Sequence, residues 1–255
     1  MLWLSLLLLL VAFGHVLASP AGERSVSGPD LDTLRKLSIS SASREEQKLD
    51  SPSSVAARSA DAAEKPQRYF SELIIRDPSR SELAPKDHVL FKWEFQFAKP
   101  DRYQVKQTAW DGQYYVVDDW ITIGSEEFIN ILYWMKKENT RSELNELLRV
   151  DKYLPILRQE VPTSASVYRY YGHRYFVLEY ETPRLGDLGK LVAALPKPGH
   201  LRIWIDSESG LPAKAELVAL GVTGRGKQAR FHLEQTIAGY GSDIRIETPK
   251  TAEPQ

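Results

Sequence analysis

The sequence predicts an α+β domain: a large curved antiparallel sheet with short helices packed on one side. Residues 91–97 read Phe-Lys-Trp-Glu-Phe-Gln-Phe, so every odd position is aromatic and every even position is polar. This is the period of a half-buried strand. Further segments of this kind follow, separated by turn residues, and helical periodicity interrupts them. The order of strands, helices and strands is typical of an α+β domain.

The first strands are expected to form an antiparallel meander. The strand at 91–97 is followed by the turn Lys99-Pro100-Asp101 and by a strand at 102–106. Asp111-Gly112 is a typical hairpin turn and precedes a strand at 114–117. The remaining strands are expected at residues 167–171, 175–181, 201–206, 213–220 and 230–237, with a short last strand at 244–247.

Two helices are expected between these strands. The first begins at Ser125, a candidate N-cap that two glutamates follow. The apolar residues on its buried face are Phe128, Ile131, Leu132 and Met135. The second begins at Thr140, with Glu143 three residues later in a capping-box arrangement. Its apolar stripe consists of Leu144, Leu147 and Leu148.

A third helical stretch covers residues 185–195. The apolar residues at helical spacing in it are Leu185, Leu188, Leu191, Val192 and Leu195. Gly186 and Gly189 weaken this helix, because glycine loses more backbone entropy in a helix than other residues do. We therefore expect a mobile flap over the sheet.

The N-terminus has the features of an export signal. It is rich in leucine, uncharged as far as Gly22, and carries Val16-Leu17-Ala18 where a signal peptidase reads small residues. We expect a signal peptide over residues 1–18, a mature chain that starts near Ser19, and a periplasmic location, with an extracellular one as the alternative. An uncleaved N-terminal membrane anchor is a second alternative, because about 20 uncharged residues can just span a bilayer.

The next segment lacks the residues that build a core. Residues 19–65 are rich in Ser, Pro and Ala and contain no aromatic side chain. Such a segment buries too little apolar surface to offset its ordering entropy, so we expect a disordered linker. One folded domain is expected over residues 66–250, followed by a disordered tail over 251–255.

Composition and motifs argue against several classes of function. Lys and Arg number 33 and Asp and Glu 34, so no basic field is present to hold nucleic acid. The absence of cysteine excludes disulfides, thiol catalysis, thiolate metal sites and a lipidated cysteine. No HExxH, GxSxG or GxGxxG motif occurs. We therefore expect a protein that is not an enzyme.

Two features that resemble catalytic motifs have simpler explanations. Residues 221–227 resemble a phosphate-binding loop, but Gln228 stands where a magnesium-binding Ser or Thr is needed, so a hairpin turn is expected. Asp118 and Asp119 would point to opposite faces of a strand. A glycosidase needs two carboxyl groups that face each other across a cleft, so a hydrolase is the least favoured class.

Several segments share their order with a known family. They are Phe97-Ala98-Lys99-Pro100-Asp101-Arg102-Tyr103-Gln104-Val105, the hairpin at 111–115, the strand–turn–strand unit at 201–206 and 210–214, and the ending at 240–249. Together they resemble the LolA-like and LppX-like proteins, the periplasmic lipoprotein carriers and their relatives, over most of residues 66–250. The resemblance implies an unclosed β-barrel around an apolar cavity for acyl chains, without catalysis or cofactor.

The candidate ligand-binding residues follow from the family's pattern and from the alternation of the strands. They are Phe91, Trp93, Phe95, Phe97, Tyr103, Val105, Leu201, Ile203 and Ile205. The leading hypothesis is an exported binding protein that holds a lipid or the acyl chains of a lipoprotein, as a lipid or lipoprotein carrier would. The alternative is an envelope sensor or scaffold domain of the same fold, with a packed core and a protein partner. The aromatic stripe fits both, because a close-packed core would use the same residues.

Overall fold

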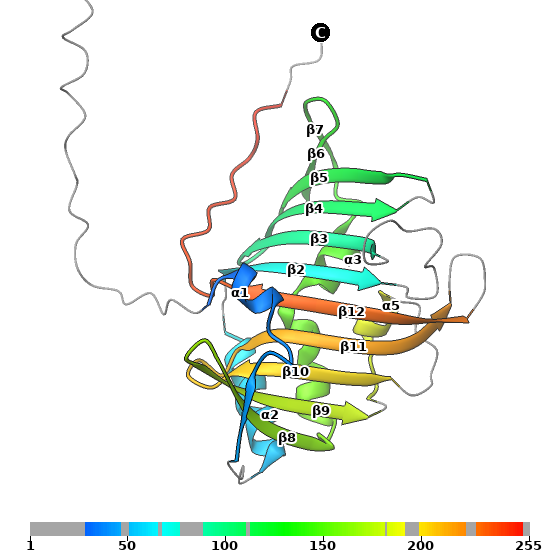
Figure 1. Ribbon diagram of the computed structural model, residues 1–255. Coiled ribbons are helices and arrows are strands. Elements are labelled where there is room, and N and C mark those ends of the chain that lie inside the picture. Colours follow the sequence, from blue (N-terminus) through cyan, green and yellow to red (C-terminus); the bar gives the residue numbers. More distant parts are fainter. Residues whose placement is uncertain are drawn as a thin grey trace, which may run out of the picture.

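A single antiparallel sheet organises the molecule. The computed structural model describes residues 29–46, 51–65, 68–76, 89–110, 113–181, 183–191, 199–222 and 228–251. Their strands form one twelve-stranded sheet in the order β1-β8-β9-β10-β11-β12-β2-β3-β4-β5-β6-β7. Figure 1 shows a tall, twisted stack with β8 near the bottom and β7 at the top. Because β1 and β7 are separate edges, the barrel is not closed, and the predicted fold class is confirmed.

The elements have the following bounds. The strands are β1 (Ser43–Glu45), β2 (Arg68–Arg76), β3 (Val89–Ala98), β4 (Arg102–Trp110), β5 (Tyr115–Ile123), β6 (Glu126–Asn130), β7 (Trp134–Glu138), β8 (Ser164–Tyr170), β9 (His173–Glu181), β10 (His200–Asp206), β11 (Pro212–Val222) and β12 (Gln228–Ala238). The helices are α1 (Leu31–Arg35), α2 (Pro52–Ala63), α3 (Ser142–Leu148), the 3₁₀ helix η2 (Val150–Tyr153), α4 (Leu154–Gln159) and α5 (Asp187–Lys190).

The alternation in β3 places its aromatic side chains on the concave face of the sheet. Trp93, Phe95 and Phe97 are buried, while Glu94 and Gln96 between them lie on the opposite face and are only partly buried. In register, Phe95 pairs with Val105 of β4, and the same row continues into β5 and β6. Side chains in such a row pack laterally across the strands. The concave face is therefore apolar across neighbouring strands.

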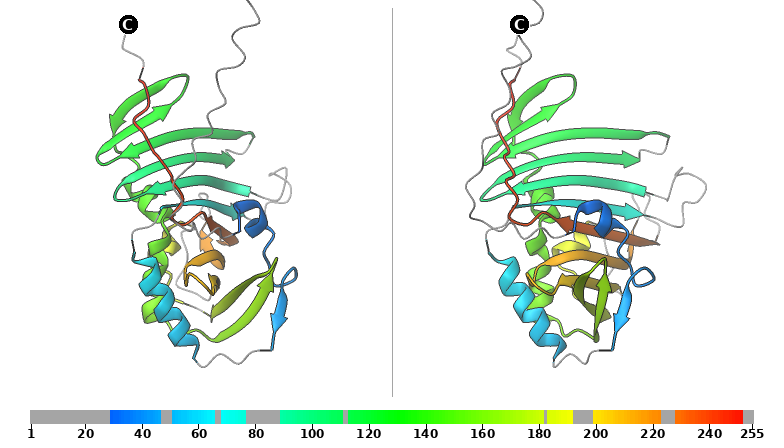
Figure 2. Two further views of the ribbon diagram at one scale, coloured as in Figure 1. Left: turned by 90° about the vertical axis from the view of Figure 1, so that its left-hand side faces the viewer. Right: turned by 60° about the vertical axis from the view of Figure 1, so that its left-hand side comes forward.

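Helices cover this concave face over the lower part of the sheet. Figure 2 shows α2 and α4 side by side, and the two are in contact. Val55, Ala56 and Ala60 of α2 and Ile156 and Leu157 of α4 belong to the same core cluster as the buried aromatic residues of β3. The small alanines allow α2 to approach closely. None of the helices in the described ranges is long and apolar enough to span a membrane.

The helix expected from Ser125 is wrong, because residues 126–138 form the hairpin β6–β7. Ile129 packs in the main core and pairs with Trp120 of β5, whereas Phe128 packs on the opposite face of the sheet. Apolar residues at helical spacing thus serve both faces of a strand. Extension of the sheet gives Phe128, Ile129 and Met135 apolar partners on its two faces.

The second expected helix exists as α3 but begins two residues later, at Ser142. The Thr140 hydroxyl does not cap it and instead donates to Glu127 Oε1 at 3.3 Å. Residues 244–247 form no strand. They run as an extended segment whose Ile244 and Ile246 pack on the outer face of the sheet, and Arg102 Nη1 donates to Ile246 O at 2.8 Å.

The disordered linker expected over 19–65 does not describe its later part. Within the described residues 29–46 and 51–65 lie α1, β1 and α2. Leu34 and Leu37 are buried on the outer face of the sheet, against a cluster that includes Trp204. The segment needs no aromatic residues of its own because the sheet supplies them. The signal peptide expected over 1–18 lies outside the described residues.

A charged network ties α1 to the sheet. Glu72 of β2 is buried and accepts hydrogen bonds from Arg35 Nε and Nη2, both at 2.8 Å, and its carboxylate lies 2.7 Å from Lys92 Nζ. Burial alone would raise the pKa of Glu72, but the hydrogen bonds from Arg35 and Lys92 outweigh it, and the pKa is lowered. Lys214, also buried, donates to Leu37 O at 2.6 Å.

Removal of a buried leucine should release α1. Leu37 has no exposed surface, so Leu37→Ala should lower the free energy of unfolding by about 2–5 kcal/mol and open the bonds after Arg35 and Lys36 to trypsin. Ile39→Ala is the control, because Ile39 is 36% exposed and should change stability by about 0.5 kcal/mol or less. Rapid tryptic cleavage after Arg35 in the unaltered protein would contradict the docking of α1.

Candidate functional site

The nine residues predicted to bind a ligand fall into two groups on the concave side. Phe91, Trp93, Phe95, Phe97, Tyr103 and Val105 lie on the adjacent strands β3 and β4, whereas Leu201, Ile203 and Ile205 lie on β10. Three strands, β11, β12 and β2, separate the two groups. All except Phe91 are buried in one core cluster. The structure therefore places eight of them in packed surroundings and one, Phe91, partly exposed to solvent.

The aromatic stripe runs from the core to solvent at the N-terminal end of β3. Phe91 is 36% exposed and stacks on Trp93, with ring centroids 5.3 Å apart and planes inclined by 10°. The Trp93 indole N–H donates to Gln107 Oε1 at 2.8 Å. In register, Phe91 pairs with Ala109, which pairs with Val116 of β5, itself 39% exposed. We call Phe91, Ala109 and Val116 the rim.

Two hydrogen-bonded polar side chains inside the concave face, Gln235 and Asn145, fix helices on the sheet. Gln235 is fully buried, accepts from the Tyr153 hydroxyl at 2.7 Å, and donates to Ser71 Oγ and Leu148 O. Asn145 of α3 accepts from the Trp120 indole at 3.1 Å. These bonds hold η2 and α3 on the sheet. Such satisfied networks make the core more rigid.

An arginine that sequence reasoning missed lies beside the stripe. The Arg141 guanidinium sits over the Trp120 ring, 4.3 Å from its centroid, and lies 3.9 Å from both Asp118 Oδ2 and Glu127 Oε1. At 3.9 Å neither contact is a hydrogen bond. Arg141 Nη1 and Glu127 Oε2 are buried without a hydrogen-bond partner. No sequence motif marks this group, because its members come from β5, β6 and the start of α3.

The flap expected over residues 185–195 is only partly described. Leu188 in α5 is fully buried, and Leu185 and Leu191 pack against the core cluster, near η2. Val192 and Leu195 lie outside the described residues. The docked leucines confirm neither mobility nor a cover over a cavity, so the flap stays a prediction.

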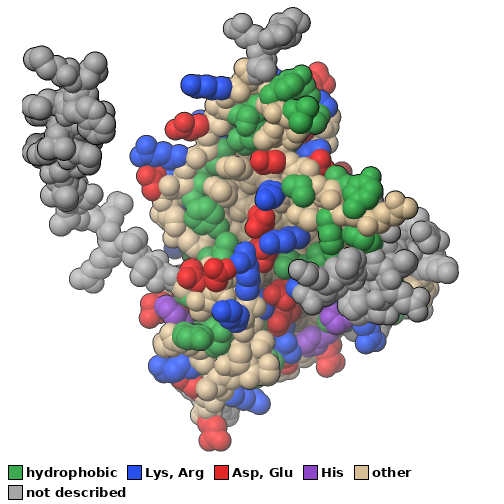
Figure 3. All heavy atoms as spheres, turned by 45° about the horizontal axis from the view of Figure 1, so that its top comes forward, with side chains coloured by type: hydrophobic (Ala, Val, Ile, Leu, Met, Phe, Trp, Pro, Cys, Tyr) green, Lys and Arg blue, Asp and Glu red, His purple; other side chains and the backbone are tan. Residues whose placement is uncertain are grey.

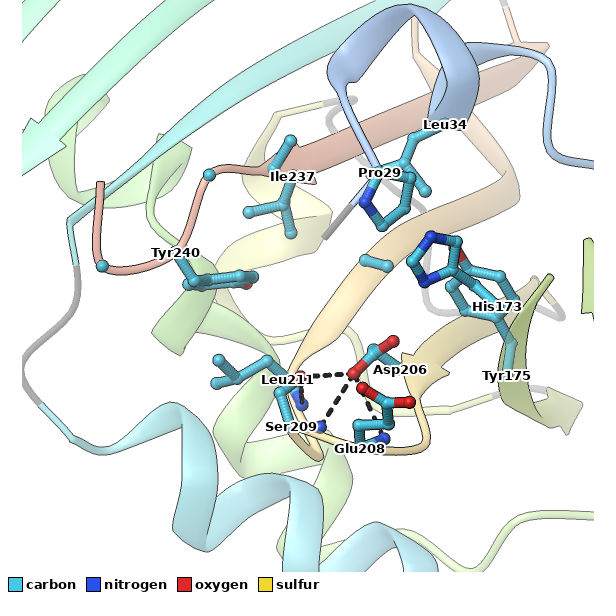
Figure 4. Close-up of a pocket in the computed structure, with 14 residues that line it drawn as sticks. Pro29, Leu34, His173, Tyr175, Asp206, Glu208, Ser209, Leu211, Ile237 and Tyr240 are labelled. Atoms are coloured by element: carbon cyan, nitrogen blue, oxygen red, sulfur yellow. Dashed lines mark hydrogen bonds between the residues drawn. The ribbon is translucent and has the colours of Figure 1, made fainter. Parts of the chain in front are cut away.

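A separate pocket lies on the outer side of the sheet, between α1 and the β10–β11 turn (Figure 4). Leu34, Tyr175, Leu211 and Tyr240 are among its lining residues. Asp206 shapes the turn by accepting from the Ser209 N–H and hydroxyl, both at 2.8 Å. The volume of about 220 Å³ is below the range of about 300–1,000 Å³ that ligand sites occupy. This pocket is therefore too small for a lipid.

The described side chains also show no metal centre. Among residues 29–251, excluding the gaps given above, no group of three or more His, Asp or Glu side chains lies where it could hold a metal ion. His88 lies outside the described residues. Burial lowers the pKa of His232, and the positive charges of Arg230 and Arg76 lower it further.

Comparison with known proteins identifies the fold. No protein-family model and no curated protein matches the sequence. The structure superposes on LprF from Mycobacterium bovis with a TM-score of 0.53 and 10% sequence identity, over 78% of this chain and 96% of that chain. This chain has the LprF fold. A LolA superfamily protein, NE2245 from Nitrosomonas europaea, matches over the same shares at 10% identity and a TM-score of 0.27.

The likeness to LprF bears on the fold expectation. The LolA-like and LppX-like fold that the sequence resemblance implied is confirmed. At 10% identity the likeness shows the LprF fold alone. The chemistry of the site must therefore come from the residues of this chain.

The rim and the core should respond differently to truncation. Trp93 is 5% exposed, so Trp93→Ala should lower the free energy of unfolding by about 3–5 kcal/mol, because it leaves a void and an unpaired Gln107. Phe91→Ala should cost about 1–2 kcal/mol, since its ring is partly in water. Denaturation in urea measures both. Equal losses would show that Phe91 belongs to the closed core.

A buried lysine should make stability depend on pH. Lys152 of η2 donates to Leu147 O at 2.6 Å, and burial lowers its pKa to about 7. The unfolded chain keeps the ordinary pKa near 10.5 and so binds more protons between pH 7 and 10. The free energy of unfolding should therefore rise with pH across this window and be flat just below it.

Substitution tests this dependence. Lys152→Met should abolish the rise in stability between pH 7 and 10, as measured by urea denaturation at several pH values. Lys36→Met is the control, because Lys36 is exposed and should leave the rise intact. An unchanged pH profile in Lys152→Met would show that other groups cause it.

Proposed function

We propose that this protein is exported and holds a lipid, or the acyl chain of a lipidated ligand, on its concave face without catalysing a reaction. One observation carries the proposal: the aromatic stripe of β3 is continuous from the closed core to the partly exposed Phe91. An acyl chain laid against the rim would extend this stack. The LprF fold and the resemblance to periplasmic lipid and lipoprotein carriers support the same ligand class.

The energetics favour an apolar ligand. Each methylene removed from water contributes about 0.8 kcal/mol, so a chain of about twelve carbons can bind without any polar contact. Arg141 offers a place for the polar end, because its guanidinium is only loosely paired with Asp118 and Glu127. The two carboxylates leave this group with a net negative charge, so a neutral or zwitterionic end fits better than an anionic one.

Deeper entry of an acyl chain requires movement of a helix. The stripe beyond Trp93 is closed by the core cluster, to which Leu188 of α5 and Leu148 of α3 belong. α5 has four residues and is preceded by Gly186, whose φ is +51°. It is therefore the element that can separate from the core at the lowest cost. In this proposal α5 opens the way from the rim toward Phe95.

The carrier role and the location extend the proposal. A protein that binds acyl chains and is exported, as the N-terminus suggests, can move lipids or lipoproteins between envelope membranes. Both the signal peptide over 1–18 and the periplasmic location rest on the sequence.

A second candidate function is a sensor or scaffold domain that binds an envelope protein. The observation in its favour is the packing of the predicted site, since eight of the nine residues lie in the core cluster. In that case the stripe is core, and the exposed Phe91 is its last member.

Binding of a fluorescent fatty acid separates the two candidates. Phe91→Ala should weaken binding about tenfold, because it removes one large apolar contact. Ile39→Ala is a matched control, since Ile39 and Phe91 are both 36% exposed and Ile39 lies between α1 and β1. Native mass spectrometry of the unaltered protein should detect bound lipid. Protein without lipid in repeated preparations, together with equal affinity in both variants, would favour the scaffold function.

A further inference from the structure

The exposed apolar side chains gather at one end of the sheet. Ten large apolar residues are exposed in the described part of the chain, and seven lie on β3 to β7 or their connections. These seven, which we call the apolar end, are Phe91, Tyr114, Val116, Val117, Ile131, Leu132 and Tyr133. In Figure 3, where the top of the molecule in Figure 1 comes forward, groups of hydrophobic side chains lie on this part of the surface.

The tip of the β6–β7 hairpin projects farthest into solvent. Its three consecutive residues Ile131, Leu132 and Tyr133 are 67%, 90% and 54% exposed. Figures 1 and 2 both show this hairpin at the far end of the sheet from α2. Asp119 of β5 pairs with Asn130, so the tip lies beyond this pair, on the side of Val117. Single exposed apolar residues are ordinary, but three in a row on a projection are not.

The hairpin is anchored directly beside its tip, so the tip is held in place. Trp134 packs on the outer cluster that contains Ile244, and Met135 packs on the inner core cluster. The two residues that follow the tip thus pack against opposite faces of the sheet. The apolar tip cannot fold back onto the core to hide its side chains.

The surroundings of the tip favour a lipid bilayer over a protein partner. Residues 131–135 carry no charge and include a tyrosine and a tryptophan, the side chains that prefer membrane interfaces. Lys136 and Lys137 lie two and three residues beyond Trp134 on β7, about 7–10 Å farther from the tip at about 3.3 Å per strand residue. That spacing fits apolar side chains at about 5–10 Å depth with ammonium groups among the lipid headgroups.

The edge strand argues against pairing with a second copy. β7 is five residues long and ends in Lys136, Lys137 and Glu138. Short, charged edge strands oppose sheet-to-sheet association. The edge strand is thus protected against association with a second copy, while the tip stays apolar. This arrangement is expected where the partner is a lipid bilayer.

We propose that the β6–β7 tip, residues 131–133, inserts into the surface of a lipid bilayer and turns the rim toward it. Lys136 pairs with Glu126, and Glu138 follows, so the local charge is nearly balanced. Insertion is therefore driven by apolar area and needs no anionic lipid. The proposal stands without the binding of an acyl chain at Phe91, although such binding would give the insertion a purpose.

A single thiol can report on the tip in the full chain, because the sequence has no cysteine. An environment-sensitive fluorophore on Leu132→Cys should shift to the blue when vesicles of phosphatidylcholine are added, and nitroxide groups on the acyl chains should quench it. Vesicles of phosphatidylcholine and phosphatidylglycerol should give the same result. The label on Val161→Cys is the control, since Val161 is 77% exposed in the connection between α4 and β8.

This design separates the tip from any other attachment to the vesicle. A label at 132 that stays in water while the protein is bound would overturn the proposal, and so would equal quenching at 132 and 161. A shift at 132 that grows with protein concentration without vesicles would assign the tip to contact between copies and likewise overturn it.

Charge at the tip provides a second measurement. With the label on Tyr133→Cys, the double change Ile131→Asp and Leu132→Asp should reduce insertion about a hundredfold, and Val161→Asp should not affect it. The melting temperature checks that both variants fold. Binding of a soluble fluorescent fatty acid without vesicles should be equal in both. Insertion by a protein that binds no fatty acid would refute the proposed function and leave this proposal standing.

Discussion

An open sheet of twelve strands has two faces to bury, and the structure depends on how each is covered. On the concave side the cover comes from η2, α4 and α2, which pack against the aromatic residues of β2 to β4. Burial of large aromatic side chains is the main stabilising contribution here. A closed barrel would have needed no such cover. The unclosed sheet therefore makes the helices, short as they are, part of the core.

The outer face is covered by segments near the two ends of the chain. α1 lies over the β8–β12 part through Leu34 and Leu37, and the extended segment after β12 lies over β2–β6 through Ile244 and Ile246. Each cover is fixed by polar contacts: Arg35 with the buried Glu72, and Arg102 with Ile246 O. A buried carboxylate is tolerated only with such partners. The ion pair with Arg35 therefore explains how the charged Glu72 can be buried on the outer face of the sheet.

The upper part of the sheet is the exception, and it is where the functional proposals meet. Strands β3 to β7 and their connections carry most of the exposed large apolar residues, among them Phe91, Val116 and the tip at 131–133. The loosely paired Arg141 lies beside the aromatic stripe. Exposed apolar surface lowers solubility, so its concentration at one end needs a compensating use. Contact with lipid, both as ligand and as bilayer, gives such a use.

The sequence by itself determined the fold class and most strands. Alternation along a strand is local, so residues 91–97 reveal their two faces without knowledge of the partner strands. The tertiary structure decided three other matters. Residues 126–138 pair with β5 although their apolar spacing suits a helix, and α1 and α2 are ordered because the sheet supplies their apolar partners. The third is the exposure of the stripe: Trp93 is buried and Phe91 is not, because cover by helices and neighbouring strands ends between them. Such cover depends on elements distant in the sequence, which periodicity along one strand cannot reveal.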